Sequence, residues 1–337
     1  MDAVRLYAPK DLRFETIDKA PAPGTGEVRI KVAYAGICGS DIHNFKTGAW
    51  ISRSPSTAGH EFSGWIDAVG DDVGSLKPGD KVAADSRHYC GKCRNCLAGN
   101  EHLCETLGFV GEATDGGFAE YVTLPARLAV RGEPQARLDV LALAEPLAVA
   151  LHALNRTGLG DADPLLVVGC GPIGALVALA SDVQSERKIL VCDIDEIRAA
   201  TVASAANATA IALDAFDQHD NPAGAAVSHV IDTTGSVAVI SRLISKLSGA
   251  TLGLVGIGSG TLDFDPVVAV EKEISIAGCH AFKDELPLAV KMLERHSDRF
   301  EPFIEHRIAL TDTPGEFAKI VAGRAAGIKT LIEICPG

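Results

Sequence analysis

The sequence predicts an α/β protein of two domains, a mainly-β first domain followed by a domain with a doubly wound parallel sheet. The length of 337 residues suggests about two domains at roughly 150 residues each. Residues 1–145 consist of short strand patterns separated by Gly and Pro turns, whereas from residue 146 apolar strands alternate with Ala-rich helical stretches. This alternation is typical of a parallel sheet covered by helices. We therefore expect domains at 1–145 and 146–282, with a segment at 283–337 that returns to the first domain.

The first domain shows strands by alternation. The stretch "GEVRIKVAYAGIC" (26–38) alternates apolar and polar residues, as expected for a half-buried strand. The stretch "WIDAVGDDVGSLKPGDKVAA" (65–84) predicts a strand, a Gly/Pro turn and a second strand.

A cysteine-rich lobe is expected at 88–105. Its stretch "CGKCRNCLAGNEHLC" contains Cys90, Cys93, Cys96 and Cys104, a pattern with three competing interpretations: a disulfide knot, a redox pair or a metal site. The charged N-terminus shows no secretory signal, so we expect a cytoplasmic protein whose thiols stay reduced, and nine cysteines, an odd number, argue against a disulfide framework. A redox pair needs one C-x-x-C beside a βαβ pattern, whereas here two C-x-x-C motifs overlap and a fourth cysteine follows. Four thiolates at this spacing instead favour a closed structural zinc site.

Bulk composition excludes several classes of function. A hydrophobic fraction of 47% allows sizeable cores, so the chain is not a disordered tail protein. The formal net charge of −13, without a basic cluster, makes nucleic acid and anionic membranes poor partners. The apolar run at 164–181 is interrupted by "GCGPIG", which indicates a buried strand, turn and helix and not a membrane span.

The second domain repeats a strand–helix order. Its strand and helix patterns follow one another as "PLLVVG" before "PIGALVALASDV", "RKILVCD" before "EIRAATVASAANA", and "VSHVID" before "VAVISRLISKL", with "GATLGLVG" and "EISIAG" as further strands. Such an order predicts a doubly wound parallel sheet.

A dinucleotide-binding fingerprint lies where the first of these strands meets its helix. Gly169, Gly171 and Gly174 form G-x-G-x-x-G, which allows a tight turn and the close approach of backbone N–H groups to a pyrophosphate. Asp193 ends the next strand, 19 residues after Gly174, where its carboxylate would accept hydrogen bonds from a ribose 2′-OH and repel a 2′-phosphate. This favours NAD over NADP, although a helix N-cap is the other interpretation of Asp193. The later "GLVGIGSG" is interpreted as backbone near the nicotinamide. The candidate cofactor-binding residues are Gly169, Gly171, Pro172, Ile173, Gly174, Asp193, Arg198, Thr234, Val255 and Gly256.

A second set of candidate metal ligands lies in the first domain. The stretch "CGSDIH" contains Cys38, Ser40 and His43, and "GHEFSG" contains His60 and Glu61. Cysteine, histidine and carboxylate are zinc ligands, and three of them with an open fourth position make a catalytic site. Taken singly, each residue also fits a buried cysteine, a core histidine or an exposed glutamate, so the spacing leaves both interpretations open.

Together these motifs resemble the zinc-dependent medium-chain dehydrogenases. The pieces "AGICGSDIH", "GHEFSG", "VGDDVGSLKPGDKV", "CGKCRNCLAGNEHLC", "DGGFAEYV", "AEPLAVALHA" and "VVGCGPIG" occur in the order seen in that family, over nearly the whole chain. The resemblance implies a mainly-β GroES-like catalytic domain plus a Rossmann domain. Because Glu145 stands where zinc alcohol dehydrogenases carry a second ligand cysteine, the chain looks like the polyol and sugar branch, which includes sorbitol, threonine and idonate 5-dehydrogenases.

Carried over to this chain, the resemblance implies NAD and two zinc ions. Cys38, His60 and Glu61 would hold the catalytic zinc, with Glu145 as an alternate ligand or as the carboxylate that holds the water on the ion. Zinc with one thiolate and one glutamate is neutral, so Glu61 and Glu145 are expected to take turns as ligands. Ser40 would accept the hydroxyl proton and pass it toward His43 while the carbon-bound hydrogen leaves as hydride to NAD+.

The substrate is less well defined by the sequence. Where the sorbitol branch has an aromatic–Arg–aromatic trio, this chain has His280, Ala281 and Phe282, which argues against sorbitol itself. Trp50 and Phe109 are candidate pocket walls. We expect oxidation of a secondary alcohol of a polyol, sugar or sugar acid by a homotetramer, or alternatively a homodimer. The alternatives are an NAD-dependent dehydrogenase of simple alcohols or aldehydes and a non-catalytic, zinc-stabilised NAD-binding protein.

Overall fold

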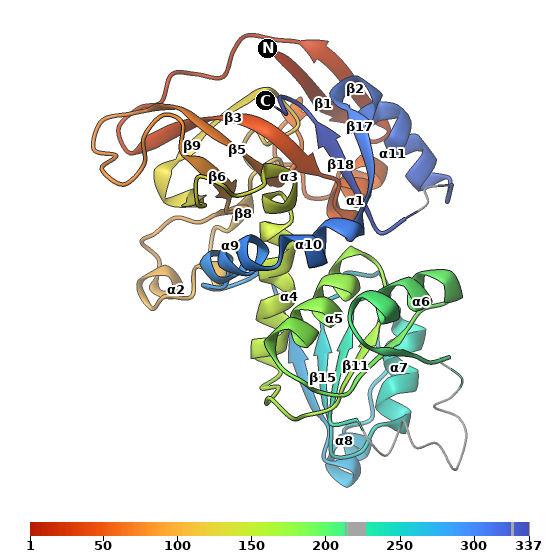
Figure 1. Ribbon diagram of the computed structural model, residues 1–337. Helices are drawn as coiled ribbons and strands as arrows, with labels where there is room; N and C mark the ends of the chain where they lie inside the picture. Colours follow the sequence, from red (N-terminus) through yellow and green to blue (C-terminus); the bar gives the residue numbers. More distant parts are fainter. Residues whose placement is uncertain (213, 215–226, 325–326, 337) are drawn as a thin grey trace. The chain divides into compact units, whose positions relative to one another are not determined.

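The protein divides into two compact units, one of which is made of two separate segments of the chain. The computed structural model describes residues 1–212, 214, 227–324 and 327–336. Unit 1 comprises Met1–Glu145 and Leu286–Gly337, and unit 2 comprises Pro146–Glu285 (Figure 1). The chain therefore passes twice between the units, once after Glu145 and once after Glu285.

Unit 1 is built on a largely antiparallel sheet. Across this sheet the strands follow the order β10 (Ala129–Arg131), β6 (Lys81–Ala84), β5 (Glu61–Val69), β3 (Glu27–Gly36), β18 (Lys329–Glu333) and β17 (Ile304–Ala309), with β9 (Tyr121–Pro125) also paired to β3. A smaller sheet has the order β2 (Asp11–Thr16), β1 (Asp2–Ala8) and β4 (Ser56–Thr57), and β7 (Arg87–His88) pairs with β8 (Gly108–Phe109). The parallel pair β17–β18 comes from the end of the chain, so the returning segment completes the main sheet.

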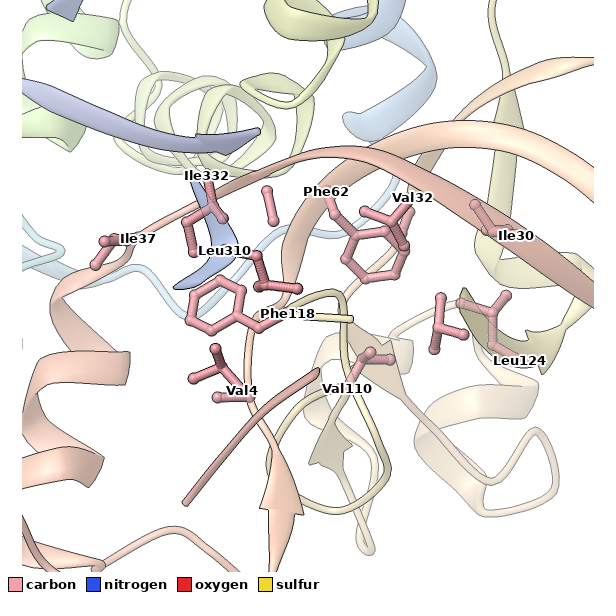
Figure 2. Close-up of a cluster of buried hydrophobic side chains, with 14 of the residues drawn as sticks. Val4, Ile30, Val32, Ile37, Phe62, Val110, Phe118, Leu124, Leu310 and Ile332 are labelled. Carbon is pink, nitrogen blue, oxygen red and sulfur yellow. The ribbon is translucent and has the colours of Figure 1, made fainter. Parts of the chain in front are cut away.

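The core of unit 1 lies against β3 and its neighbours. Because successive side chains of a strand point to opposite faces, Val32 and Phe62 face a common apolar cluster with Phe118 and Ile332 (Figure 2). The residue before Phe62, Glu61, is directed away from that cluster and lies opposite Gly36 in the β3–β5 register. The same alternation that fills the core thus places a carboxylate on the other face of the sheet.

Short helices connect the strands of unit 1. They are α1 (Gly39–Thr47), α2 (Arg94–Leu97), α3 (Leu138–Leu141), the start of α4 (Ala144–Arg156), α9 (Leu286–Arg295), α10 (Ser297–Phe300) and α11 (Thr313–Val321). Helix α1 follows β3 almost directly, with Cys38 as its N-cap. The Asp41 carboxylate accepts a hydrogen bond from the Cys38 N–H at 2.9 Å and so closes the first turn of α1.

Unit 2 contains the predicted doubly wound parallel sheet. Its strands have the order β13 (Thr209–Ala210), β12 (Ile189–Cys192), β11 (Leu165–Val168), β14 (His229–Asp232), β15 (Thr251–Leu254) and β16 (Ser275–Gly278), and all these pairs are parallel. The strand order reverses between β11 and β14, and in such sheets ligands bind at the carboxyl ends of the strands at this point. The fold class predicted from the sequence is confirmed.

Helices connect the parallel strands of unit 2. They are α5 (Pro172–Gln184), α6 (Glu196–Ala205), α7 (Val237–Lys246) and α8 (Pro266–Lys272), and the rest of α4 also belongs to this unit. The run at 164–181 forms β11, the turn and most of α5, so the expected strand–turn–helix is present. Among the described residues no helix is both long and apolar enough to cross a membrane.

Candidate active site and metal centres

Four cysteine sulfurs converge in the lobe between β7 and β8. The Sγ atoms of Cys90, Cys93, Cys96 and Cys104 lie within 4.8 Å of one another, and all four thiols are free. The Sγ atoms of Cys93 and Cys96 are 3.5 Å apart, far beyond a disulfide bond of about 2.05 Å. Tetrahedral zinc with Zn–S bonds of about 2.3 Å needs sulfurs roughly 3.8 Å apart. The four cysteines therefore fit a closed zinc site.

The backbone of this lobe is shaped around the sulfurs. Gly91 and Gly99 have φ angles of 70° and 71°, a region that favours glycine, and they give the two sharp turns of the lobe. Backbone N–H groups of Lys92 and Cys93 point at the Cys90 sulfur at 3.5 and 3.3 Å. These hydrogen bonds lower the pKa of Cys90 to about 6, because they stabilise the thiolate that a metal requires.

The second predicted ligand set also comes together. One donor atom each from Cys38, His60 and Glu61 lies within 4.8 Å of the other two. Cys38 follows β3 as the N-cap of α1, His60 directly precedes β5 and Glu61 begins β5, so the antiparallel pairing of β3 and β5 brings the three residues together. His60 and Glu61 are buried, and a thiol, an imidazole and a carboxylate are a donor set that zinc accepts.

Asp41, which the sequence analysis did not assign, connects two of these ligands. Its one carboxylate oxygen accepts from the Cys38 N–H, and the other lies 3.5 Å from His60 Nδ1. Burial alone would lower the pKa of His60, but the charges of Asp41 and Cys38 outweigh it and raise the pKa well above its usual value. A carboxylate on the second ring nitrogen orients a metal-binding histidine and raises its basicity, so Asp41 has the position of such a support. The signal was available as the Asp within "CGSDIH".

Ser40 and His43 occupy different surroundings. The Ser40 Oγ lies 3.3 Å from His60 Nε2, directly beside the candidate ligands. The half-buried His43 ring stacks on Trp50 with centroids 4.2 Å apart. Trp50 is 38% exposed and Phe109 is half-buried in β8, paired with Arg87.

Glu145 is buried at the start of α4. Its Oε1 accepts a hydrogen bond from the Ser86 hydroxyl at 2.6 Å. Burial, reinforced by the charge of Glu61 and opposed by that of His60, raises the pKa of Glu145 to about 7. Two glutamates therefore lie near the same ligand set, each with a hydrogen-bond partner of its own.

The partner of Glu61 is Lys329, a residue with no motif around it in the sequence. The Lys329 ammonium group donates to Glu61 Oε2 and, at 2.9 Å, to the Ile37 carbonyl. Both side chains of the ion pair are almost fully buried, at 2% and 1% exposure. Burial would lower the pKa of Lys329, but the charges of Glu61 and Cys38 raise it overall.

A buried polar pair also lies next to this region. Asn44 donates to the Glu112 carboxylate at 2.8 Å and accepts from the Trp50 N–H at 3.1 Å. The sequence analysis assigned neither Asn44 nor Glu112, because nothing in their local sequence distinguishes them.

The fingerprint of unit 2 forms the turn between β11 and α5. Gly169 has a φ angle of 94°, and a Cβ on Gly174 would overlap the Gly169 carbonyl, so both positions require glycine. A Cβ on Gly171, the N-cap of α5, would meet nothing within 4 Å. This open space above a helix N-terminus that begins with Pro172 and Ile173 fits a pyrophosphate.

Asp193 is held at the end of β12. Its two carboxylate oxygens accept from the N–H groups of Cys170 at 2.6 Å and Asp195 at 2.8 Å. Asp195, and not Asp193, is the N-cap of α6, since its side chain accepts from Ile197 and Arg198 N–H. The Arg198 guanidinium lies 3.8 Å from Asp193.

The remaining cofactor candidates lie at the carboxyl ends of β14 and β15. Thr234 Oγ1 donates to Asp232 at 2.6 Å, and the N–H groups of Val255 and Gly256 donate to the Asp232 carbonyl. A Cβ on Gly256 would overlap the Gly235 backbone, so "GLVGIGSG" forms a close backbone contact between two loops.

The three residues aligned with the aromatic–Arg–aromatic trio follow β16. His280 is exposed, Ala281 has a φ angle of 50°, and Phe282 is fully buried. These positions carry an exposed imidazole and a buried phenyl ring, and no guanidinium.

Comparisons with known proteins agree with this geometry. Residues 24–134 match the family model "Alcohol dehydrogenase GroES-like domain". Sorbitol dehydrogenase of Arabidopsis thaliana is 30% identical over 331 residues, covering 93% of this chain and 90% of that protein. Galactitol-1-phosphate dehydrogenase from Escherichia coli is 26% identical with a TM-score of 0.90, covering 99% of this chain and 100% of that one. A structure from Sinorhizobium meliloti 1021, described as a zinc-binding dehydrogenase bound to NADP, is 25% identical with a TM-score of 0.89 and covers 98% of each chain.

Fold and site together define a zinc-dependent oxidoreductase with a dinucleotide-binding unit. The chain belongs to the zinc-dependent medium-chain dehydrogenase family, in its polyol dehydrogenase branch. The resemblance inferred from the motifs is confirmed.

Proposed function

We propose that this protein oxidises a secondary alcohol of a polyol, sugar or sugar acid, with zinc and NAD as cofactors. The observation that carries the proposal is the convergence of Cys38, His60 and Glu61 within 4.8 Å, with Glu145 buried beside them in place of a second cysteine ligand. Relatives that act on sorbitol and galactitol-1-phosphate support the substrate class.

The residues of the site have separable roles in this proposal. Cys38, His60 and Glu61 would hold the catalytic zinc, which when bound supplies Lewis-acid stabilisation of the substrate oxygen. Asp41 orients the His60 ring from its other nitrogen. Ser40, beside His60, accepts the proton of the substrate hydroxyl while it releases its own hydroxyl proton toward the half-buried His43, which passes a proton to solvent.

The cofactor is proposed to be NAD and not NADP. The Asp193 carboxylate is fixed by two backbone N–H groups, so it cannot turn away from a 2′-phosphate. Its negative charge favours a ribose with a free 2′-OH. Gly169, Gly171 and Gly174 provide backbone at the β11–α5 turn, and Arg198 places a cation 3.8 Å from Asp193. Thr234, Val255 and Gly256 lie farther along the sheet, at the carboxyl ends of β14 and β15.

A homo-oligomer is also proposed. The edge strand β16 carries an exposed Ile276, and helix α8 in the same unit exposes Val267 and Val270 at 56% and 77%. An exposed apolar sheet edge pairs readily with another strand, so a second copy of the chain is a fitting partner. The exposed Leu97 and Leu103 of the cysteine lobe offer a second surface for a tetramer.

The experiment that tests the function is NAD+ reduction by the purified protein with polyols, aldonic acids and simple primary alcohols. We expect polyols or aldonic acids to give the highest kcat/KM and Cys38→Ser to abolish the reaction. Faster oxidation of simple primary alcohols would establish the alternative alcohol dehydrogenase. Absence of reduction with every substrate, in a protein that binds zinc and NAD, would establish a non-catalytic protein.

A further inference from the structure

The ion pair between Lys329 and Glu61 crosses a strand. Gly36 of β3 pairs with Glu61 of β5 on one side and with Leu331 of β18 on the other. Lys329 of β18 therefore reaches Glu61 over the backbone of β3. A Cβ on Gly36 would overlap Glu61 Oε2 and lie 2.8 Å from Lys329 Cε, so the contact exists only because residue 36 is glycine.

The Glu61 carboxylate contacts Lys329 and also belongs to the set of candidate zinc ligands. Oε2 accepts from the ammonium group of Lys329, while the same side chain supplies a donor atom to the set with Cys38 and His60. Lys329 is also anchored to the Ile37 carbonyl, one residue before Cys38, so its position is fixed relative to the ligands. A buried cation beside a buried ligand carboxylate competes with a metal ion for the same negative charge.

Glu145 is the second carboxylate that takes part in this competition. It lies near the same set but accepts from Ser86, an uncharged hydroxyl, and no lysine or arginine contact to it is found among the described residues. Zinc with Cys38 and one glutamate is neutral, so whichever glutamate is not a ligand needs another partner. Among the described residues, Lys329 forms an ion pair with Glu61, whereas its charge acts on Glu145 without a direct contact.

We infer that Lys329 is a positioning residue that shares Glu61 with the catalytic zinc and pairs with Glu61 when Glu145 replaces it as a ligand. The inference rests on the proposed catalytic site. A lysine with a purely structural role would change the stability of the fold but not the retention of one particular metal ion.

The test measures zinc release from the holoenzyme to a chromogenic chelator. Release should show two phases, and Cys38→Ser, which lacks the catalytic site, identifies the phase that belongs to it. In Lys329→Met that phase should become about tenfold slower, since loss of a neighbouring positive charge leaves Glu61 to the metal alone. The phase of the cysteine lobe should not change. Lys329→Arg should restore release to near the wild-type rate.

Lys81→Met is the matched control for Lys329→Met, and Lys329→Gln is a second variant. Lys81 of β6 is a half-buried lysine of the same sheet that donates to the Ala136 carbonyl at 2.7 Å, and Lys81→Met should leave both phases unchanged. If Lys329→Met does not fold, Lys329→Gln, which can still donate to Ile37, carries the same expectation. In a Glu61→Gln background, Lys329→Met should have no effect on the catalytic phase.

The outcomes separate the two proposals. A wild-type protein whose zinc content is the same as that of Cys38→Ser would overturn the catalytic site itself. A wild-type protein with an additional zinc, released from Lys329→Met at the wild-type rate or faster, would overturn only the role of Lys329.

Discussion

At the scale of single residues, function depends on side chains whose partners are already fixed before any ligand binds. Asp193 accepts two backbone N–H groups, Asp41 accepts from the Cys38 N–H, and Glu145 accepts from Ser86. Such preorganised groups lose little freedom when the cofactor or metal arrives, so each single substitution is expected to have a specific effect.

Asp193→Asn tests the cofactor preference. The amide keeps an acceptor for a backbone N–H but removes the charge, so the ratio of kcat/KM for NADP+ to that for NAD+ should rise about tenfold or more. Asp195→Asn removes the same charge two residues away, at the N-cap of α6, and should leave the ratio unchanged. Equal use of both cofactors by the wild-type protein would show that Asp193 does not discriminate.

Glu285 predicts a pH effect within unit 2. Burial opposes ionisation, but hydrogen bonds from His152 at 3.0 Å and Asn155 at 3.1 Å, with the Lys283 N–H, lower the pKa of Glu285 to about 2. A carboxyl whose pKa is lower in the folded state stabilises the fold above its unfolded pKa of about 4.5, and this stabilisation is lost as the pH falls toward 2.

Glu285→Gln should therefore lower the free energy of unfolding at pH 7 by about 1–3 kcal/mol. The difference from the wild type should shrink between pH 4.5 and 2, which denaturant titrations at several pH values would measure. A difference that is constant over this range would show that ionisation of Glu285 is not the cause.

At the scale of elements, the cysteine lobe is a small unit with its own candidate metal site. Short helix α2, two left-handed glycines and four sulfurs enclose little apolar core, since Leu97 and Leu103 point outward at 76% and 51% exposure. Segments of this kind depend on a metal because binding energy replaces burial.

Cys93→Ser should remove one zinc per chain and lower the melting temperature, with turnover largely retained in molecules that stay folded. Cys38→Ser should show the reverse, a melting temperature near that of the wild type and no alcohol oxidation. Metal analysis, melting curves and initial rates on both variants make the comparison. Loss of turnover in folded Cys93→Ser with its catalytic zinc in place would mean that the lobe takes part in the reaction.

Features that depend on local patterns could be predicted from the sequence, whereas contacts between distant elements could not. The Rossmann turn and the four cysteines are marked by short-range patterns of glycine and cysteine that their chemistry requires locally. The spacing of Cys38, His60 and Glu61 left their role open, and the order of motifs along the whole chain was needed to assign them. Lys329 is separated from Glu61 by 268 residues, and its own neighbours look like an ordinary strand. The pair Asn44 and Glu112 is equally invisible, because only the folded chain shows that both side chains are buried.

At the scale of the whole molecule, the exposed edge of the parallel sheet predicts assembly. Ile276→Lys places a charge on β16, which should weaken pairing with a second copy and lower the mass measured by light scattering. Ile197→Lys on α6, where the isoleucine is 81% exposed, is the matched control and should leave the mass unchanged. A wild-type protein that is monomeric at micromolar concentration would contradict the proposed oligomer.

The strand β18 has a consequence for how the protein is made. The sulfurs of the cysteine lobe lie within fifteen residues of one another, so this site can take up its metal while the chain is still on the ribosome. The contact between Glu61 and Lys329 closes only after all of unit 2 has been synthesised, and contacts so distant along the chain form slowly. Nascent chains are therefore expected to fill the two metal sites in a fixed order, the lobe early and the site beside Gly36 in its final form only when β18 has joined β3.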